Sequence, residues 1–438
     1  MDRSEIERLV LRARGLAVLR GVLRSPAARD LLALLRLLAV ERPDPEPVAE
    51  TFGRLWEELA AQPDPLLPDA WQAHLVARLL EDENPFSLTA ERGPAGFLSG
   101  ALLGQVRRDL GVLRELFDLD GGALLAMVEG KVSGVAGLWV PWDDPGRVGE
   151  DTARREIARK LAVAGDWGGC AERLAEHFHR HGAGTFGRYR AFRWGADGLR
   201  AVLRPDPASL VGLVGYERER EPLIRNTERF LAGLPAHHAL LYGLPGTGKS
   251  STVKAVLNEY ANEGLRLVEV AKEDLGALPR VLEILRGRGG RFILFVDDLS
   301  FEEHEVEYKS LKALLEGSIE EPPENVRLYA TSNRRNLIRE SFSDREDSDD
   351  VHARDTMHEK LSLAARFGLR LTFPSPNQRR YLEIVAGLAE QRGLKLSAED
   401  LRERALLWDR WHAGRSGRTA RQFVDELEAE LAHSQSAP

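Results

Sequence analysis

Eight consecutive residues, Gly243-Leu244-Pro245-Gly246-Thr247-Gly248-Lys249-Ser250, constrain the fold of this chain more than any other feature. They fit the P-loop pattern G-x-x-x-x-G-K-[ST] at every fixed position. An apolar run at residues 239–242 precedes them and predicts a short buried strand, and residues 251–260 follow with the apolar spacing of a helix. Such a loop directs backbone N–H groups and the positive end of the helix dipole at a phosphate. The sequence therefore predicts a site for a nucleoside triphosphate.

The motif also predicts what its residues do. Its glycines allow the backbone to wrap closely around the phosphates, Lys249 is expected to reach the β- and γ-phosphates, and the Ser250 hydroxyl is expected to ligate Mg²⁺. We expect Lys249 to be a solvated group without a role in the core. The nucleotide-binding residues predicted from this segment are Pro245, Gly246, Thr247, Gly248, Lys249, Ser250 and Ser251.

Length and composition predict two or three domains and no membrane segment. The 438 residues, of which 43% are hydrophobic, suffice for sizeable cores. We expect no signal peptide, and the most apolar stretch, residues 31–40, contains Arg36 and is too short to span a bilayer. Cys170 is the only cysteine, which excludes an intrachain disulfide. We therefore expect a cytoplasmic protein, and its net charge of -8 argues against a surface that coats nucleic acid.

Three parts follow one another along the chain. Residues 1–205 carry apolar helical stripes, such as the one at residues 102–117, and are expected to form a mainly helical domain. A proline-containing linker then leads into an α/β nucleotide-binding core, which we place at residues 206–375 because strand and helix patterns alternate there. A helical lid is expected at residues 376–438.

Two further strand ends carry polar residues. The apolar run at residues 292–296 predicts a central parallel strand, and Asp297 at its carboxyl end is expected to hold Mg²⁺ through water. Asp298 follows, where a glutamate usually orients the attacking water; an aspartate is one methylene shorter, so the water is displaced or hydrolysis is slow. Another strand, at residues 326–330, leads to Asn333, a candidate for contacting the γ-phosphate or the water from the sensor 1 position.

In this order, the P-loop, the acidic strand end, Asn333, the A-R-F-G turn at residues 365–368 and the helical lid resemble an AAA+ ATPase. The V-D-D and R-F-G-x-x-L segments are most similar to the replication initiator and loader branch. The whole chain also resembles a bacterial family of predicted AAA+ ATPases of unassigned function with a helical N-terminal region. The resemblance implies an α/β core with a parallel five-stranded sheet in the order 5-1-4-3-2, and hydrolysis of ATP with Mg²⁺.

The resemblance also implies assembly and further site residues. Arg366 matches the arginine finger, which is inserted into the nucleotide site of a neighbouring subunit, so a homo-oligomer is implied, with about six subunits by resemblance. Val214 and Gly215 match the segment that packs against adenine. Arg418 is the candidate for sensor 2 in the lid, and Arg421, one turn further on, is the alternative.

Some features depart from the family or point elsewhere. We expect no basic DNA-binding domain after the lid, and the acidic insertion at residues 339–360 is expected to be a solvated loop near the subunit interface. His177 and His181 lie near Cys170, but we interpret them as groups that complement the end of a helix, because no further metal ligand is evident. Residues 186–194, FGRYRAFRW, have a pattern that stacks on single-stranded nucleic acid, yet we favour an extended segment with packed aromatics and paired arginines.

Three functions remain open at this point. The first is an oligomeric ATPase that remodels or loads an unidentified macromolecular partner through its N-terminal region. The second is a slowly hydrolysing switch whose ATP and ADP states differ in partner affinity, which the aspartate at position 298 keeps open. The third, a small-molecule P-loop kinase, fits poorly, since kinases need neither an intersubunit arginine nor a long separate helical domain. Nucleic acid as the partner has no support in the sequence.

Overall fold

The computed structural model describes residues 1–61, 65–142, 152–300, 311–312, 314–315, 322–333, 363–412 and 414–436. These residues form two compact units, each with a hydrophobic core of its own. Unit 1 comprises Met1–Arg188 together with Gly287–Gly290, and unit 2 comprises Tyr189–Arg286 and Arg291–Pro438.

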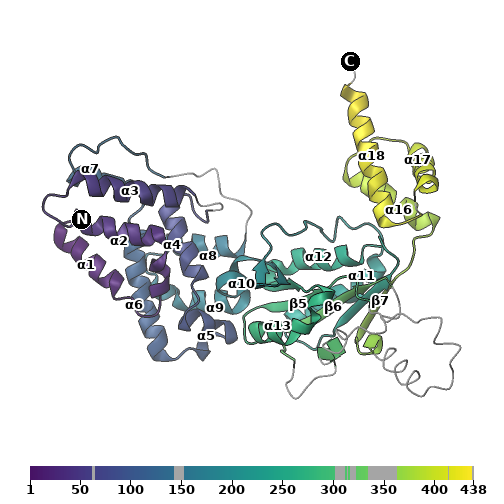
Figure 1. Ribbon diagram of the computed structural model, residues 1–438, viewed down its shortest axis with the longest axis horizontal. Helices are drawn as coiled ribbons and strands as arrows, with labels where there is room; N and C mark the ends of the chain where they lie inside the picture. The colour runs from purple at the N-terminus through teal and green to yellow at the C-terminus, as the bar shows by residue number, and fades with distance from the viewer. Residues whose placement is uncertain are drawn as a thin grey trace. The chain divides into compact units, whose positions relative to one another are not determined.

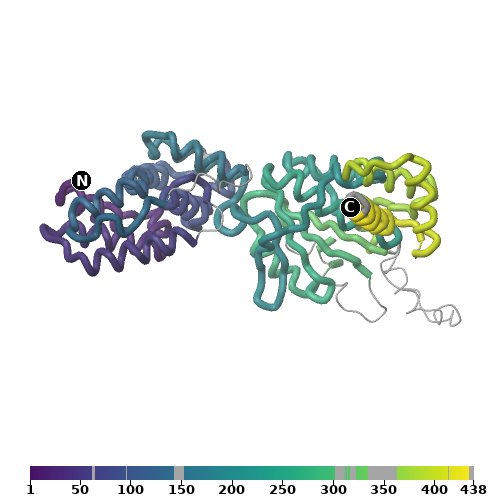
Figure 2. The backbone as a smooth tube through the Cα atoms, turned by 90° about the horizontal axis from the view of Figure 1, so that it is seen from above, coloured from purple at the N-terminus to yellow at the C-terminus, as the bar shows by residue number. Residues whose placement is uncertain are grey.

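Unit 1 is mainly helical, as the sequence predicts for the N-terminal part. Its α-helices are α1 (Arg3–Arg14), α2 (Pro26–Leu38), α3 (Pro45–Ala60), α4 (Ala70–Glu81), α5 (Pro85–Arg92), α6 (Gly100–Phe117), α7 (Gly121–Lys131), α8 (Ala153–Val163), α9 (Ala171–His181) and α10 (Gly184–Arg188). Local signals set their starts: in α2 the Ser25 hydroxyl accepts from the backbone N–H of Ala28, and Pro26 occupies the first turn. Helices α2 and α3 lie side by side (Figure 1, Figure 2).

Unit 2 contains a seven-stranded sheet in the order β2-β1-β4-β5-β6-β3-β7. The strands are β1 (Ala191–Gly195), β2 (Gly198–Ala201), β3 (Ala239–Gly243), β4 (Leu265–Glu269), β5 (Arg291–Val296), β6 (Val326–Ser332) and β7 (Leu369–Phe373). Strands β1 and β2 are antiparallel, and the other neighbours are parallel. When β3 is counted as the first strand of the core, β3 to β7 lie in the order 5-1-4-3-2. The predicted α/β class of an AAA+ core is confirmed.

The connections bring the candidate site residues to one edge of the sheet. Helix α12 (Lys249–Tyr260) leads from β3 to β4, and α13 (Leu278–Leu285) leads from β4 back to β5. Since parallel crossovers are right-handed, these helices cover opposite faces of the sheet (Figure 1). The carboxyl ends of β3, β5 and β6 therefore open at the same edge, where ligands bind in sheets of this kind.

The predicted lid is a group of three helices, α16 (Gln378–Gln391), α17 (Ala398–Trp411) and α18 (Gly417–Ser436), which pack on one another. Tyr381 and Ile384 of α16 and Val424 of α18 are buried in the core that the lid shares with the sheet and with α11 (Glu217–Leu231). The lid thus belongs to the same compact unit as the P-loop.

The hairpin of β1 and β2 was not predicted, because residues 191–201 were assigned to the helical N-terminal domain. In the structure β1 adds to β4 at the sheet edge, and burial alternates along it: Phe192 and Trp194 are buried, whereas Arg193 is exposed and pairs with Glu269. Unit 2 accordingly starts at Tyr189, upstream of the expected boundary at residue 205. The packed aromatics and the paired arginine agree with the interpretation favoured for FGRYRAFRW, but the segment is not extended throughout, because residues 186–188 belong to helix α10.

A buried histidine joins two strands of the sheet. His238 immediately precedes β3, is partly buried, and its Nδ1 accepts the backbone N–H of Leu328 on β6 at 2.9 Å. Burial lowers the pKa of His238 to about 4, and the charge of Arg327 and the neighbouring His237 act in the same direction. The neutral ring is therefore needed to complete the strand pairing.

We predict that His238 makes the fold sensitive to acid. The unfolded chain binds a proton at His238 near pH 6.5 and the folded chain only near pH 4, so stability falls as the pH drops through this window. The loss amounts to roughly 3 kcal/mol. His238→Asn keeps an acceptor near Leu328 without titrating, so its unfolding free energy, measured by urea denaturation at several pH values, should decline less. The exposed His433→Asn, near the end of α18, serves as the control, and an unchanged pH profile in His238→Asn contradicts the prediction.

Candidate functional site

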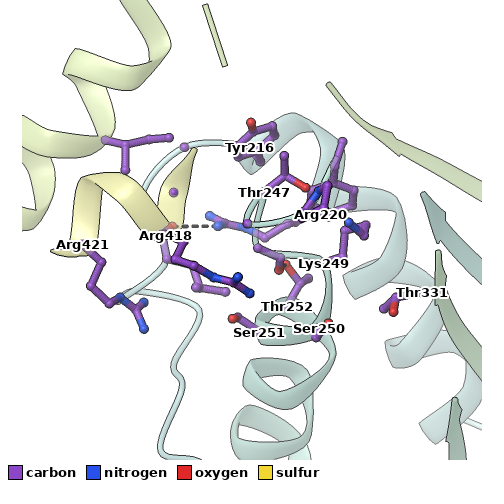
Figure 3. Close-up of a pocket in the computed structure, with 18 of the residues that line it drawn as sticks. Tyr216, Arg220, Thr247, Lys249, Ser250, Ser251, Thr252, Thr331, Arg418 and Arg421 are labelled. Atoms are coloured by element: carbon purple, nitrogen blue, oxygen red, sulfur yellow. Dashed lines mark hydrogen bonds between the residues drawn. The ribbon is translucent and has the colours of Figure 1, made fainter. Parts of the chain in front are cut away.

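A cavity of about 480 Å³ lies at the carboxyl edge of the sheet. Its walls come from the loop before α11, the P-loop and the start of α12, the ends of β5 and β6, and the lid helices α16 and α18 (Figure 3). Every P-loop residue from Pro245 to Ser251 lines it, together with Val214, Gly215, Asp297, Asp298, Asn333 and Arg418. The fold thus brings all but one of the predicted site residues to one place.

The P-loop takes the backbone course that its glycines permit. Gly246 and Gly248 have φ of 77° and 90°, and Gly248 stands directly before the first residue of α12. Gly246 is also the point where the lid meets the loop: its carbonyl accepts the backbone N–H of Arg418 at 3.2 Å, and a Cβ atom there would lie 3.2 Å from the Arg418 Cβ. A side chain at position 246 would therefore disturb both the loop and the lid contact.

Lys249 is not the solvated group that the sequence suggested. Its residue is only 6% exposed, because its side chain folds back against the loop. The ammonium donates to the carbonyls of Gly243 and Leu244 at 2.7 and 2.9 Å, and to the Asn333 Oδ1 at 3.1 Å. Burial lowers the pKa of Lys249, and the carboxylates of Asp298 and Asp297 oppose this shift.

Two of the predicted magnesium ligands lie in contact. The Ser250 hydroxyl donates to the Asp297 Oδ1 at 2.6 Å, and the same oxygen accepts the Thr331 hydroxyl at 2.5 Å. Hydroxyl and carboxylate oxygens are the ligands that Mg²⁺ prefers, so this donor set fits that ion. Thr331 was not among the predicted site residues. The signal that would have indicated it was its hydroxyl in the polar T-S-N segment that leads from β6 to Asn333.

Asp298 is held in an unusual conformation. Its φ is 51°, in the left-handed region that non-glycine residues rarely occupy and that costs about 1–3 kcal/mol. Its backbone N–H donates to the Thr331 hydroxyl at 2.9 Å, and its Oδ1 accepts from the Asn333 Nδ2 at 2.5 Å. Asn333 therefore bridges Lys249 and Asp298, and three strand ends meet through these side chains.

The loop before α11 and helix α16 form an apolar wall of the cavity. Val214 of the loop lies against α16 at Gly387, where a Cβ atom would come within 2.6 Å of the Val214 Cγ1. Ile384 and Leu388 of the same helix also line the cavity. The loop ends at Tyr216, whose φ is 63° and whose hydroxyl donates to the Pro374 carbonyl at 2.7 Å. This wall has the apolar character that a flat aromatic base requires.

The three candidate arginines differ in their positions. Figure 3 shows the Arg418 side chain directed toward the start of α12, where Lys249 and Ser250 lie, whereas the Arg421 side chain runs away from them. The pKa of Lys249, lowered mainly by burial, is lowered further by the nearby charge of Arg418. Arg366 is exposed in the turn before β7 and lies outside the cavity lining. Arg220 of α11 does line the cavity, and the sequence analysis did not identify it.

Other predicted features lie outside the described residues or carry no site. The acidic insertion at residues 339–360 falls in a segment that the structure does not describe, and so do Glu302 and Glu303, two acids that follow Asp298 in the sequence. Across the described ranges, no group of three or more His, Cys, Asp or Glu side chains is placed to hold a metal. His177 and His181 pack ring against ring at 5.0 Å near the end of α9. None of the helices in the described part of the chain has the length and apolar character needed to cross a bilayer.

Comparison with known proteins gives a family and a set of distant folds. The model of the family described as "Protein of unknown function (DUF815)" matches residues 187–431, more than half of the chain. None of the curated proteins matches the sequence. The similar solved structures include the RuvB Holliday junction branch migration motor of Thermotoga maritima, at 18% identity and a TM-score of 0.37, covering 52% of this chain and 67% of that chain. Two variants of that protein match at 16% and 17% identity, with TM-scores of 0.37 and 0.38 and the same coverage.

Lys249→Ala should abolish binding of a triphosphate and also weaken the fold. The substitution removes the ammonium that the phosphates need, and it removes the hydrogen bonds to the Gly243 and Leu244 carbonyls and to the Asn333 Oδ1. We expect the free energy of unfolding to fall by roughly 1–3 kcal/mol. Equilibrium binding of a fluorescent ATP analogue and thermal unfolding without nucleotide measure the two effects. Lys395→Ala, which removes an exposed lysine of the lid, is the control, and unchanged affinity in Lys249→Ala contradicts the assignment.

Proposed function

We propose that this chain, which belongs to the DUF815 family of proteins of unknown function, is a Mg²⁺-dependent ATPase of the AAA+ type that acts on a macromolecular partner as an oligomer. One observation carries the proposal. Direct hydrogen bonds at one cavity link residues from two strand ends and one helix start, namely Lys249, Ser250, Asp297, Asp298 and Asn333.

The groups around the cavity divide between binding and charge stabilisation. The backbone N–H groups at the start of α12 and the Lys249 ammonium hold the β- and γ-phosphates, as in other P-loops. Ser250 and Asp297 hold Mg²⁺, which neutralises charge on the phosphates when bound. Arg418 approaches from the lid and would add a cation beside the phosphates. Val214, Gly215 and Ile384 supply the apolar wall for the base.

Asp298 is the acid that orients the attacking water. Its strained backbone and its bond to Asn333 fix the carboxylate at the cavity, beside the end of β6. The triphosphate gives Lys249 new partners, so Asn333 can then contact the γ-phosphate or the water instead. Because the aspartate is shorter than a glutamate, we expect slow basal hydrolysis, which a partner accelerates.

A slow ATP/ADP switch is the second candidate function. It is favoured by the direct bond between Asn333 and Asp298, since this bond engages the carboxylate that hydrolysis requires. The rate with and without a partner separates the two functions, because a switch hydrolyses slowly even when it is assembled.

Arg366 is the residue on which the oligomeric part of the proposal depends. It is exposed and lies away from the residues that line its own cavity. An arginine in that place serves a nucleotide site only when it belongs to a neighbouring subunit, where it would neutralise charge that develops on the γ-phosphoryl group. We propose that ATP favours a ring of about six subunits and that unit 1 engages the partner.

Asp297 and Asp298 should separate binding from hydrolysis. Asp297→Ala should weaken binding that depends on Mg²⁺, because it removes the carboxylate beside Ser250. Asp298→Asn keeps an oxygen for the bond from Asn333, so it should bind ATP normally and release phosphate at least tenfold more slowly. Binding of an ATP analogue with and without Mg²⁺ and steady-state phosphate release test both. Hydrolysis at the wild-type rate by Asp298→Asn would transfer the role to another acid, such as Glu302 or Glu303.

Arg366→Ala should bind ATP almost as tightly as the wild type and lose hydrolysis by roughly 10³-fold or more. Mixing it with Lys249→Ala protein should restore part of the activity, since a mixed interface pairs an intact arginine with an intact P-loop. Mass photometry with ATP or ADP reports assembly alongside the mixing assay. Arg370→Ala, which removes an exposed arginine of β7, is the control. A monomer with full ATPase activity would contradict the oligomeric mechanism.

A further inference from the structure

Arg220 is a charged residue buried at the cavity without a role in the chemistry described so far. It lies in the first turns of α11, is 6% exposed and lines the cavity. Its Nη1 donates to the Leu213 carbonyl at 2.7 Å, the bond drawn as a dashed line in Figure 3. Its Nη2 lies 3.5 Å from a carboxylate oxygen of Glu217, whose own side chain is 69% exposed.

The carbonyl that Arg220 binds belongs to the loop that forms the apolar wall. Leu213 is directly followed by Val214 and Gly215, and its neighbours are tethered as well: Gly212 donates to the Ser209 hydroxyl at 2.9 Å, and the Val211 carbonyl accepts from Gln391 of α16 at 2.8 Å. Gln391 holds the loop from the lid, whereas Arg220 holds it from the core. The position of Val214 against Gly387 therefore depends on the bond from Arg220.

Burial of this guanidinium is unfavourable in itself. Burial lowers the pKa of Arg220, and the carboxylates of Glu217 and Glu219 only oppose that shift. An apolar side chain of similar length would fill the same space without this cost, but it would leave the Leu213 carbonyl without its donor. A charged donor to a carbonyl is a stronger tether than a neutral one.

We propose that Arg220 is a positioning residue for the nucleobase: it fixes the loop from Leu213 to Gly215, so that the cavity binds a complete nucleotide more tightly than the bare phosphates. This inference rests on the proposed function, because it concerns the same site. The P-loop lies further along the chain and is held by the Lys249 contacts, so its phosphate affinity does not depend on Arg220. Loss of Arg220 therefore weakens recognition of the base and leaves recognition of the phosphates intact.

Calorimetric titration of the full-length protein with two ligands tests this division. One ligand is ATP, and the other is inorganic tripolyphosphate, which lacks the base and the ribose; both are used with Mg²⁺. We expect Arg220→Gln to bind ATP roughly tenfold more weakly than the wild type and to bind tripolyphosphate within about twofold of it, in line with the loss of a hydrogen bond from a charged donor. Arg220→Lys keeps a charged donor and should recover part of the ATP affinity. Arg218→Gln, an exposed arginine of the same helix, is the control and should match the wild type.

Each other outcome overturns the inference in a recognisable way. An equal loss for ATP and tripolyphosphate would make Arg220 a phosphate contact or a general support of the fold, and unchanged ATP affinity in Arg220→Gln would remove the role altogether. Thermal unfolding shows whether Arg220→Gln folds. If it does not, the comparison rests on Arg220→Lys, which must then lose affinity for ATP and keep its affinity for tripolyphosphate. Failure of the wild type to bind ATP refutes the proposed function itself. If the wild type binds ATP normally, an equal loss for both ligands or an unchanged ATP affinity in the variant refutes only the role of Arg220.

Discussion

The buried ammonium of Lys249 is the interaction on which the cavity depends. It joins the carbonyls at the end of β3 to Asn333 at the end of β6, and Asn333 in turn holds Asp298 at the end of β5. Three strand ends are thereby fixed relative to one another by side chains that also suit a triphosphate. The same charge that would bind phosphate thus organises the site before any ligand arrives, which limits the rearrangement that binding requires.

The lid contributes as much to this arrangement as the sheet. The backbone contact between Arg418 and Gly246 is short enough that a Cβ atom at Gly417 would lie 3.0 Å from the Gly246 carbonyl oxygen. Glycines on both sides therefore allow the start of α18 to lie directly on the P-loop. With Gln391 holding the loop before α11, the lid contacts the cavity both at the P-loop and at the apolar wall. A change in the position of the lid would affect both ends together.

Sequence patterns predicted the parts of unit 2 whose signals lie within short stretches of the chain. The glycine spacing placed the P-loop, the apolar run before Asp297 placed β5, and the resemblance to AAA+ ATPases implied the five parallel strands. The pairing within the hairpin of β1 and β2 is local, but the strand that accepts the hairpin is distant in sequence: β1 adds to β4, and Arg193 pairs with Glu269, 76 residues away along the chain. Short strands in a helical context carry little signal until the edge that accepts them is known.

By itself, the sequence determined which residues are candidates for the chemistry and the order in which they follow the strands. Residues close together along the chain suffice to specify a glycine loop, a strand-end carboxylate or a capped helix, so the spacing of these residues predicts such features. Only the tertiary structure decided how these residues meet. It buried Lys249 and placed Asp298 in a left-handed conformation. It also brought the Thr331 hydroxyl into a hydrogen bond with the Asp297 carboxylate, and Arg220 into one with the loop of the apolar wall. These features arise where separate strands and helices meet, so they depend on the packing of the whole unit.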